Sequence, residues 1–191
     1  KSYIKMGKEQ NNEYYNEVFK ASNIYHNNWS EMDAWTVIWE KSLPILIDNE
    51  VKSILDIGSG MGQFGQLCSQ NNIQYKGIDF SEYAIHHSIK NKDRLELFEC
   101  VDAFQYSYGD KVDCYTSHEF LEHIEEDIKI LSKLQSDKLI IFSVPSFDDP
   151  GHVRCFKSTE EIIERYSPYI KNLQVQQITN RVHYLGWGYT R

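Results

Sequence analysis

The stretch ILDIGSGMGQFG, residues 54–65, decides the fold that we expect for this chain. An apolar run, Ile54–Ile57, leads directly into a series of glycines, and an amphipathic stretch follows from Gln63 onward. Glycine permits the φ angles of a tight turn between a strand and a helix, and it lets a ligand approach the backbone closely. We therefore predict a strand, a ligand-binding loop and a helix, in this order.

Outward from this stretch, short apolar runs alternate with amphipathic ones, a pattern typical of a mainly parallel sheet with helices on both faces. Strands are predicted at Ser53–Ile57, Tyr75–Asp79, Leu95–Cys100, Val112–Thr116 and Leu139–Val144. Helices are predicted at Gln63–Asn71, Glu82–Asn91, Ile124–Gln135 and Thr159–Tyr166. The tail alternates as strands do, which indicates a closing antiparallel hairpin formed by Leu173–Thr179 and Val182–Tyr189, with Asn180 and Arg181 at the turn. We expect a doubly wound, Rossmann-like α/β fold.

The chain of 191 residues fits a single domain. Residues 51–191 carry the predicted sheet, and residues 1–50 are predicted to form a helical lid or cap with helices at Asn11–Lys20 and Asp33–Ile47. Aromatic residues gather in this N-terminal part: Tyr14, Tyr15, Tyr25, His26, Trp29, Trp35 and Trp39. These rings either seal the edge of the sheet or cover a ligand, and the sequence leaves both alternatives open.

Composition and charge disfavour several classes of partner. The formal net charge is −8, whereas nucleic-acid binding draws most of its affinity from Lys and Arg, so a nucleic-acid partner is not expected. No apolar run reaches the roughly 18 residues of a membrane span. Four cysteines are widely scattered: Cys68, Cys100, Cys114 and Cys155. We expect a cytoplasmic protein, either a monomer or a homodimer.

Three acidic residues follow three successive predicted strands: Asp56, Asp79 and Asp102. Asp79 comes about twenty residues after the glycine loop, where a carboxylate can accept hydrogen bonds from ribose hydroxyls. Asp102 is suited to accept from an adenine amino group. Residues 60–65 also match the GxGxxG pattern of NAD-type enzymes, but Asp56 would repel a pyrophosphate and would attract a sulfonium or ammonium group.

These segments resemble the class I S-adenosylmethionine-dependent methyltransferases, over roughly residues 51–144. LDIGSGMG is similar to the first motif of that family, GIDFSEYAI to the second, VDAF to the third and VDCYTSHEFLEHI to the fourth, whose ending is common in the small-molecule branch. The resemblance implies a seven-stranded sheet with one antiparallel strand. It also implies a set of cofactor contacts: Asp56, Gly58, Ser59, Gly60 and Gly62 to the methionine part, Asp79 and Phe80 to the ribose, Asp102 and Ala103 to the adenine, and Ser117, His118 and Glu119 to the reactive side.

Candidate catalytic and acceptor-binding residues follow the fourth and fifth predicted strands and occur in the N-terminal part. His118 and His152 are candidates for a general base, which is needed if the acceptor is a weakly acidic hydroxyl. Acceptor contacts are predicted for Tyr14, Tyr15, Tyr25, His123, His152 and Arg154. The alternatives are that His123 caps a helix and that Arg154 pairs with Asp148 or Asp149 on a surface turn.

No metal site is expected from the sequence. The run HEFLEH, residues 118–123, looks superficially like a zinc-protease helix, but its histidines are five residues apart and do not share a helical face.

The Asn/Asp-Pro-Pro-Tyr pattern of enzymes that methylate nucleobase amines is absent after the fourth predicted strand. We therefore predict methylation of a small-molecule or saccharide-like acceptor at oxygen or nitrogen, the alternatives being an NAD-type oxidoreductase and a non-catalytic S-adenosylmethionine-binding partner subunit.

Overall fold

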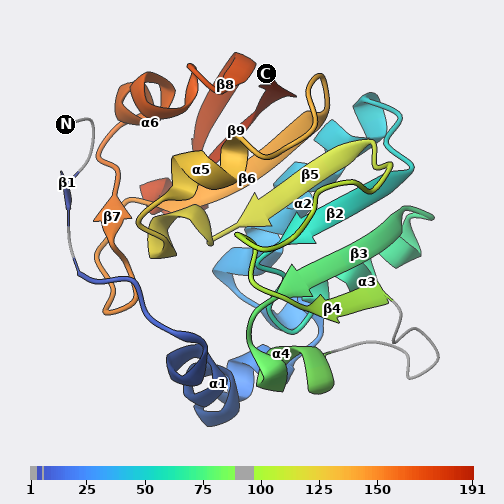
Figure 1. The fold of residues 1–191 in the computed structure, drawn as a ribbon, viewed down its shortest axis with the longest axis vertical. Helices are drawn as coiled ribbons and strands as arrows, with labels where there is room; N and C mark the ends of the chain where they lie inside the picture. Colours follow the sequence, from blue (N-terminus) through green and yellow to red (C-terminus); the bar gives the residue numbers. More distant parts are fainter. Residues whose placement is uncertain (1–3, 6, 89–96) are drawn as a thin grey trace.

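The computed structural model describes residues 4–5, 7–88 and 97–191. Its main feature is a 7-stranded sheet in the order β4-β3-β2-β5-β6-β9-β8 (Figure 1). The strands are β2 Ser53–Ile57, β3 Gln74–Asp79, β4 Phe98–Cys100, β5 Cys114–His118, β6 Leu139–Pro145, β8 Ile170–Ile178 and β9 His183–Thr190. β2 to β6 run parallel, whereas β9 is antiparallel to both β6 and β8. The predicted Rossmann-like sheet and its C-terminal antiparallel hairpin are confirmed.

Helices cover both faces of the sheet. Successive side chains of each strand point to opposite faces, so each strand contributes to two cores. Ile54 belongs to the core on one face, together with apolar residues of α2 (Ala34–Asp48) and α3 (Gln63–Gln70). Leu55 belongs to the core on the other face, together with residues of α5 (Asp127–Leu131) and α6 (Thr159–Tyr166). The predicted αβα layering is therefore present.

The predicted helix at Ile124–Gln135 is wrong in its extent. A 3-10 turn, η4, spans Leu121–His123, and α5 begins only at Asp127 because Glu126 has non-helical dihedral angles. The carbonyl groups of Leu121 and Glu125 accept hydrogen bonds from the buried guanidinium of Arg154. In a continuous helix these carbonyls would accept from the backbone amides of the following turn. Here they accept from Arg154 instead, so the helix is interrupted between η4 and α5.

Other boundaries differ by smaller amounts. The predicted strand Val112–Thr116 corresponds to β5, which starts two residues later because Asp113 Oδ2 instead accepts from the backbone amides of Lys52 (2.8 Å) and Ser53 (2.9 Å). The predicted helix Glu82–Asn91 is the short α4, Glu82–His86, and the predicted strand Leu95–Cys100 is β4. Parts of both predictions fall in residues 89–96 and lie outside the described residues.

The N-terminal part contributes α1 (Asn12–Ala21) and two 3-10 turns, η1 (Asn23–His26) and η2 (Trp29–Glu31), before α2. Figure 1 shows α1 beside α4, and the Oδ1 atom of Asn16 accepts from the hydroxyl of Ser81 (2.7 Å) and from the amide of Tyr83 (3.1 Å). A two-stranded antiparallel sheet of β1 (Ile4–Lys5) and β7 (Arg154–Cys155) was not expected from the sequence. Within the described ranges, no helix combines the length and the apolar character needed to cross a membrane.

Candidate active site

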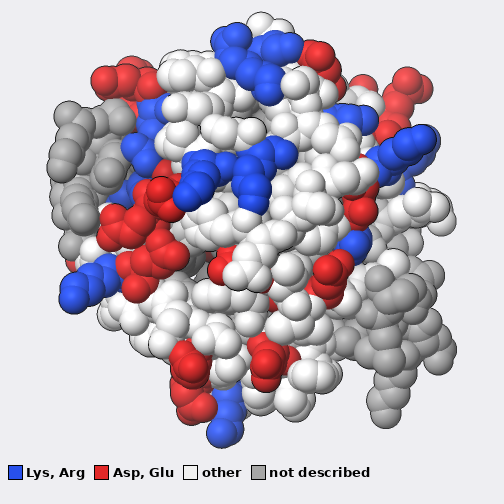
Figure 2. All heavy atoms as spheres, viewed as in Figure 1, with Lys and Arg blue, Asp and Glu red and all other residues white. Residues whose placement is uncertain are grey.

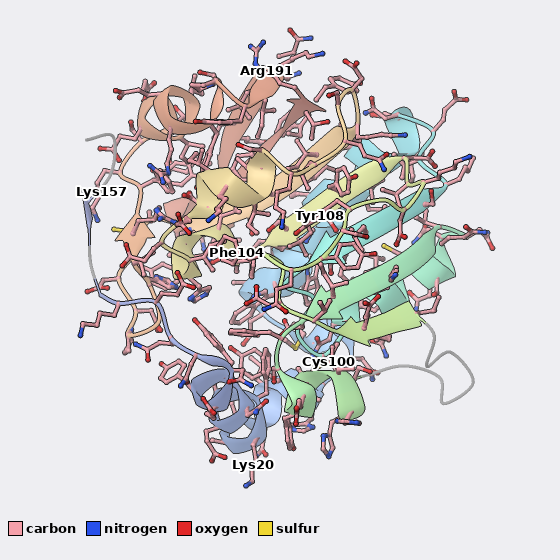
Figure 3. The ribbon with its side chains drawn as sticks, viewed as in Figure 1. Lys20, Cys100, Phe104, Tyr108, Lys157 and Arg191 are labelled. Carbon is pink, nitrogen blue, oxygen red and sulfur yellow. The ribbon has the colours of Figure 1, made fainter. Side chains whose placement is uncertain are left out.

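A pocket of about 530 Å³ lies at the carboxyl ends of the parallel strands, within the range usual for small-molecule sites. Its walls come from the loops after β2, β3, β4, β5 and β6, from the start of β9, and from the N-terminal segment that includes α1. Phe104, labelled in Figure 3, is part of the wall that follows β4. Carboxyl ends of parallel strands meet at one edge of a sheet, which explains why residues so far apart in sequence face the same space.

The glycine loop after β2 lines one end of the pocket. Gly58 has φ +76°, and a Cβ atom there would lie 2.3 Å from the ring of Phe120, so both conformation and space require glycine. The loop amides of Gly58 and Ser59 donate to the carbonyl of Ile78 (2.9 and 3.0 Å), and the Gly60 amide donates to Asp79 Oδ2 (2.9 Å). Because these amides already have partners inside the protein, the loop suits a ligand without phosphate better than a pyrophosphate.

Asp56 lines the pocket at the end of β2 and is 4% exposed. Its two carboxyl oxygens accept hydrogen bonds from the hydroxyls of Tyr75 (2.6 Å) and Thr116 (2.7 Å). Burial raises the pKa of Asp56 to about 6, and the two hydroxyls oppose this shift. At neutral pH the group is still mainly ionised, so it presents negative charge to a ligand next to the glycine loop.

Asp79, at the end of β3, accepts from the amides of Ser81 (2.8 Å) and Gly60 (2.9 Å), one at each oxygen. The two carboxylate oxygens together have four acceptor positions, so the backbone amides that contact Asp79 do not occupy all of them. Burial raises the pKa of Asp79, while the backbone amides oppose that shift. Phe80 follows directly, lines the pocket and places its ring 5.6 Å from that of Tyr15.

The loop after β4 supplies Asp102, Ala103 and Phe104 to the pocket wall. Asp102 Oδ1 accepts from the amide of Phe104 at 2.8 Å, which fixes the loop in a turn and leaves Oδ2 for other donors. All three predicted acids thus line the pocket, at or just after the ends of three neighbouring strands.

His118 is the last residue of β5, lines the pocket and is 8% exposed. The hydroxyl of Ser42 donates to the carbonyl of Ile38 (2.9 Å), so its oxygen accepts from Nε2–H of His118 (2.9 Å). The lone pair of the ring is therefore on Nδ1, which has no hydrogen-bond partner among the described residues. Burial lowers the pKa of His118 to about 3, so the ring is neutral at physiological pH.

Two glutamates with different surroundings follow β5. Glu119, with φ +50°, lines the pocket and accepts from the hydroxyl of Ser143 at 2.8 Å. Burial raises the pKa of Glu119 to about 7. Glu122 is 0% exposed, and burial and the neighbouring Glu119 hold its pKa well above the usual range. Neither carboxyl oxygen of Glu122 has a hydrogen-bond partner in the described part of the chain.

His123 and His152 face each other across the pocket wall, with ring centres 4.8 Å apart. Nδ1 of His123 lies 2.9 Å from the hydroxyl of Tyr15 and 2.9 Å from the carbonyl of Gly151, and Nδ1 of His152 lies 3.1 Å from the carbonyl of Phe147. A carbonyl only accepts, so both rings carry their hydrogen on Nδ1 and a lone pair on Nε2. Burial lowers the pKa of His123 to about 4 and lowers that of His152 as well.

His183, at the start of β9, also lines the pocket, and the sequence analysis missed it. Its Nε2 lies 3.5 Å from Glu119 Oε2, and its ring packs edge-on against that of Phe147. Burial lowers the pKa of His183 to about 4. The predicted C-terminal hairpin could have indicated His183. A strand antiparallel to β6 begins at the edge of the sheet where β6 ends, and His183 pairs with Pro145 there.

The N-terminal tyrosines predicted to bind the acceptor also reach the pocket. Tyr14 and Tyr15 line it from α1, with ring centres 5.1 Å apart, and Tyr25 lines it from η1. Burial raises the pKa of Tyr15 and that of Tyr25, so both hydroxyls stay protonated at neutral pH. Trp35 and Trp39 line the pocket while also packing on the core of the sheet.

Three predicted site residues do not line the pocket, and their placement corrects the sequence analysis. Arg154 is 1% exposed and forms a buried ion pair with Asp127 at 3.3 Å, not the surface pair with Asp148 or Asp149. Ser117 points into the sheet core because side chains alternate along β5, and it is 2% exposed. Gly62 begins α3 with φ +83°, behind the ring of Phe98. Its role is in the turn, where only glycine adopts that backbone easily.

The surface charges give no sign of a polyanion-binding face in the view of Figure 2. Basic and acidic side chains are interspersed there, so a phosphate chain crossing this face would meet both signs of charge.

Comparison with known proteins identifies the domain. Residues 55–136 match the sequence model of a family described as "Methyltransferase domain". Magnesium protoporphyrin IX methyltransferase from Synechocystis PCC 6803, solved with bound S-adenosylhomocysteine, has a TM-score of 0.68 at 16% identity, over 94% of this chain and 97% of that one. A protein from Pyrococcus horikoshii OT3 has a TM-score of 0.70 at 16% identity, over 94% and 99% of the two chains.

A third similar structure is the plantazolicin methyltransferase BpumL in complex with a triazolic desmethylPZN analog and S-adenosylhomocysteine, with a TM-score of 0.65 at 15% identity, over 92% of this chain and 94% of that one. No curated protein sequence matches this chain. The structures show that the fold is shared, and the family match covers the glycine loop and the strands that carry Asp56, Asp79 and Asp102. Residues 55–136 therefore match a methyltransferase domain, and the chain shares its fold with the solved methyltransferases over more than nine-tenths of its length.

Proposed function

We propose that this chain transfers the methyl group of S-adenosylmethionine to an oxygen or nitrogen atom of a small-molecule or saccharide-like acceptor. The observation that carries the proposal is that a single pocket joins the glycine loop to a wall of histidines. A cofactor on the loop and an acceptor against the histidines would meet in a space closed off by the N-terminal segment. Alignment of two reactants in such a space lowers the barrier by several kcal/mol without further chemistry.

The cofactor half of the pocket supplies three carboxylates for three parts of the cofactor. Asp79 has acceptor positions left for the two ribose hydroxyls, and Oδ2 of Asp102 can accept from the adenine amino group. Asp56 and the glycine loop would lie beside the methionine part, whose ammonium and sulfonium groups are attracted by a buried carboxylate. Phe80 and Ala103 add apolar walls beside the ribose and adenine sites.

In the reaction, a lone pair of the acceptor atom forms the new bond to the methyl carbon, and the electron pair of the carbon–sulfur bond remains on sulfur. The unpartnered Nδ1 of His118 can accept the proton that the acceptor loses. The low pKa of His118 makes it a weak base, which suits an acceptor whose proton is already acidic. Tyrosine rings near the sulfonium would add a cation–π attraction of about 0.5–2 kcal/mol each.

The acceptor end of the pocket combines neutral imidazoles with apolar surface. Phe147 and Val182 line it and are 37% and 38% exposed, and the ring of Phe147 lies 5.5 Å from that of His152. An acceptor with a ring, aromatic or saccharide, can stack on this surface while its polar group meets the histidines. His123, Tyr14, Tyr15 and Tyr25 complete the proposed acceptor site, and the described part of the N-terminal segment, from Glu9 onward, acts as its lid.

The test begins with calorimetric titration of S-adenosylmethionine, S-adenosylhomocysteine and NAD. The two adenosyl ligands should bind with micromolar affinity, and Asp79→Ala should lose that binding while the control Asp48→Ala, on the exposed end of α2, retains it. Binding of NAD alone would overturn the proposal. Incubation with labelled S-adenosylmethionine and a panel of hydroxylated and amino acceptors then separates an enzyme from a non-catalytic partner subunit, which would bind the cofactor and release no methylated product.

A further inference from the structure

The acceptor end of the pocket contains a side-chain cluster that methyl transfer does not require. Glu122, His123 and His152 each offer one ligand atom, and these atoms all lie within 4.8 Å of one another. The three residues come from η4 and from the loop between β6 and β7, so packing of the fold brings them together. Exposed groups of this kind occur by chance, but Glu122 is 0% exposed and His152 is 4% exposed.

The hydrogen bonds around the two histidines leave the correct atoms available for a metal ion. Nδ1 of His123 donates to the carbonyl of Gly151, and Nδ1 of His152 donates to the carbonyl of Phe147. The lone pairs are therefore on the Nε2 atoms, and Nε2 of His123 lies 3.6 Å from Glu122 Oε1. Histidines that bind metals commonly donate their other ring N–H to a backbone carbonyl, which fixes the tautomer and the ring orientation.

Glu122 supplies an independent observation. Its carboxyl group is fully buried, and neither oxygen has a hydrogen-bond partner among residues 4–5, 7–88 and 97–191. The positive charge of Arg154 favours the ionised form of Glu122, while its guanidinium donates to the carbonyls of Leu121 and Glu125 and pairs with Asp127. A buried carboxyl group without a hydrogen-bond partner is unfavourable, and a bound cation would favour its ionised form and give that form a partner.

We propose that Glu122, His123 and His152 bind a divalent first-row transition-metal ion. Two imidazole nitrogens and one carboxylate oxygen form a set of intermediate softness, which suits Mn²⁺, Fe²⁺, Co²⁺ or Zn²⁺ better than Ca²⁺ or Mg²⁺. Both histidines line the pocket, so an ion bound by them would keep coordination positions open toward the acceptor. Glu119 precedes Glu122 in the same sequence motif and lines the pocket, so it offers a further oxygen donor.

The role of the ion rests on the proposed methyl transfer, whereas its binding does not. A hydroxyl oxygen bound to a divalent cation releases its proton to water more easily, because the cation lowers the pKa of the bound group. The oxygen lone pair then forms the bond to the methyl carbon, and the sulfur keeps the electron pair of the broken bond. The ion would therefore direct methylation to a hydroxylated acceptor and would relieve the weakly basic His118 of most of the proton transfer.

The experiment measures metal binding directly on protein freed of metal with a chelator. Mn²⁺ is titrated with electron paramagnetic resonance of the free ion as the signal, and Co²⁺ with its visible absorption. Glu122→Gln and His152→Gln are compared with matched controls, Glu126→Gln and His86→Gln, whose parent side chains are exposed. We expect one ion per chain, bound at least about 100-fold more weakly in both site variants and equally well in both controls.

Affinity for S-adenosylhomocysteine, measured on the same samples, reports whether each variant is folded. Glu122→Gln keeps the shape of the side chain and replaces a buried carboxyl group without a hydrogen-bond partner by a neutral amide, so its thermal unfolding temperature should not fall. If His152→Gln unfolds, Glu122→Gln alone decides. Unsaturable metal binding, or binding unchanged in Glu122→Gln, would overturn the metal site. Saturable metal binding without any adenosyl-ligand binding would support this site and contradict the proposed function.

Discussion

The two ends of the pocket are built in different ways. The cofactor half comes from three consecutive strand-and-loop units, and its acids, Asp56, Asp79 and Asp102, lie at or just after the ends of β2, β3 and β4. The acceptor half comes from segments far apart in the chain, with Tyr15 from α1 and His183 from β9 among them. Local backbone geometry determines the first half, and long-range packing determines the second. The acceptor half can therefore change between relatives without disturbing the cofactor half.

The hydrogen bonds of the two halves also differ in how far apart in the chain their partners lie. In the cofactor half, carboxylates accept from backbone amides of their own or the neighbouring loop, as Asp79 does from Gly60 and Ser81. In the acceptor half, a neutral imidazole donates to the carbonyl of a loop far away in the chain, as His123 does to Gly151. The first arrangement presents negative charge to a cationic cofactor, and the second presents lone pairs to an acceptor or an ion.

The largest expected effect concerns the support of the acceptor half. Arg154→Met removes a fully buried guanidinium that binds Asp127 at 3.3 Å and the carbonyls of Leu121 and Glu125. We expect the free energy of unfolding to fall by about 3–5 kcal/mol, measured by urea denaturation, because buried polar partners lose their donor. Lys129→Met, the control, removes an exposed ion pair with Glu126 and should cost less than about 1 kcal/mol.

A stability loss of that size would establish Arg154 as a support of the loop that carries Glu122 and His123. Calorimetry on the folded fraction sharpens the comparison, because affinity for the adenosyl ligand should stay within a factor of about three of wild type if the halves are independent. An unchanged unfolding free energy together with a raised KM for the acceptor would instead restore the predicted substrate contact of Arg154.

The next effect concerns the cofactor half. Gly58→Ala places a Cβ atom 2.3 Å from the ring of Phe120 at φ +76°, so either the loop or the ring must move. We expect a loss of about 2–4 kcal/mol of unfolding free energy from backbone strain and overpacking, and loss of detectable binding of the adenosyl ligand. Gly109→Ala is the matched control, because its nearest side-chain atom, Ser107 Oγ, lies 3.8 Å away. If Gly58→Ala lost no more unfolding free energy and no more adenosyl-ligand affinity than Gly109→Ala, the glycine loop would tolerate a side chain at position 58.

The same division explains what the sequence could and could not predict. The glycine loop, the order of strands and the three acids follow from short-range patterns, because strand, turn and helix propensities act within a few residues. Arg154 was predicted as an acceptor contact because its loop is rich in turn residues, yet its guanidinium is buried by contacts with η4 and α5. Ser117 and Gly62 were carried over with their motif, although alternation along β5 and the turn before α3 direct them elsewhere.

Two further features of the acceptor half depended on pairings that a single sequence does not reveal. His183 reaches the pocket only because β9 runs antiparallel to β6 and starts at its carboxyl end. The cluster of Glu122 with His123 and His152 forms because η4, which was not predicted, brings two neighbouring side chains toward the β6–β7 loop. The five-residue spacing of His118 and His123 correctly excluded a shared helical face, but gave no information on His152.

A pH measurement tests the electrostatic side of the comparison. Burial raises the pKa of Asp56 to about 6, above its value in the unfolded chain, so the folded state keeps this proton longer. The stability contribution is fully present below the unfolded pKa and is lost as pH rises through about 6. Relative to Asp56→Asn, wild type should therefore lose about 1–3 kcal/mol of unfolding free energy between pH 4 and pH 7.

Urea denaturation of both proteins at several pH values gives that difference directly, because titration of all other groups cancels between them. A saturating adenosyl ligand sharpens the result: its positive groups favour the ionised carboxylate, so the pH dependence should weaken when the ligand is bound. If wild type instead lost unfolding free energy relative to Asp56→Asn as the pH fell, Asp56 would be stabilised in its charged form, which would contradict the raised pKa.

The smallest expected effect tests how the N-terminal segment connects to the acceptor half. Tyr15→Phe removes the hydroxyl that lies 2.9 Å from Nδ1 of His123 and leaves the ring against Phe80 in place. We expect a loss of about 0.5–1.5 kcal/mol in unfolding free energy, and a decrease of kcat/KM for the methylated acceptor of up to about tenfold. Tyr14→Phe is the matched control, since Tyr14 also lines the pocket and packs edge-on against Tyr15. Affinity for the adenosyl ligand should be unchanged in both variants. If Tyr15→Phe weakens cofactor binding as strongly as it slows turnover, then α1 belongs to the cofactor half, and the division of the pocket into two independently built halves is wrong.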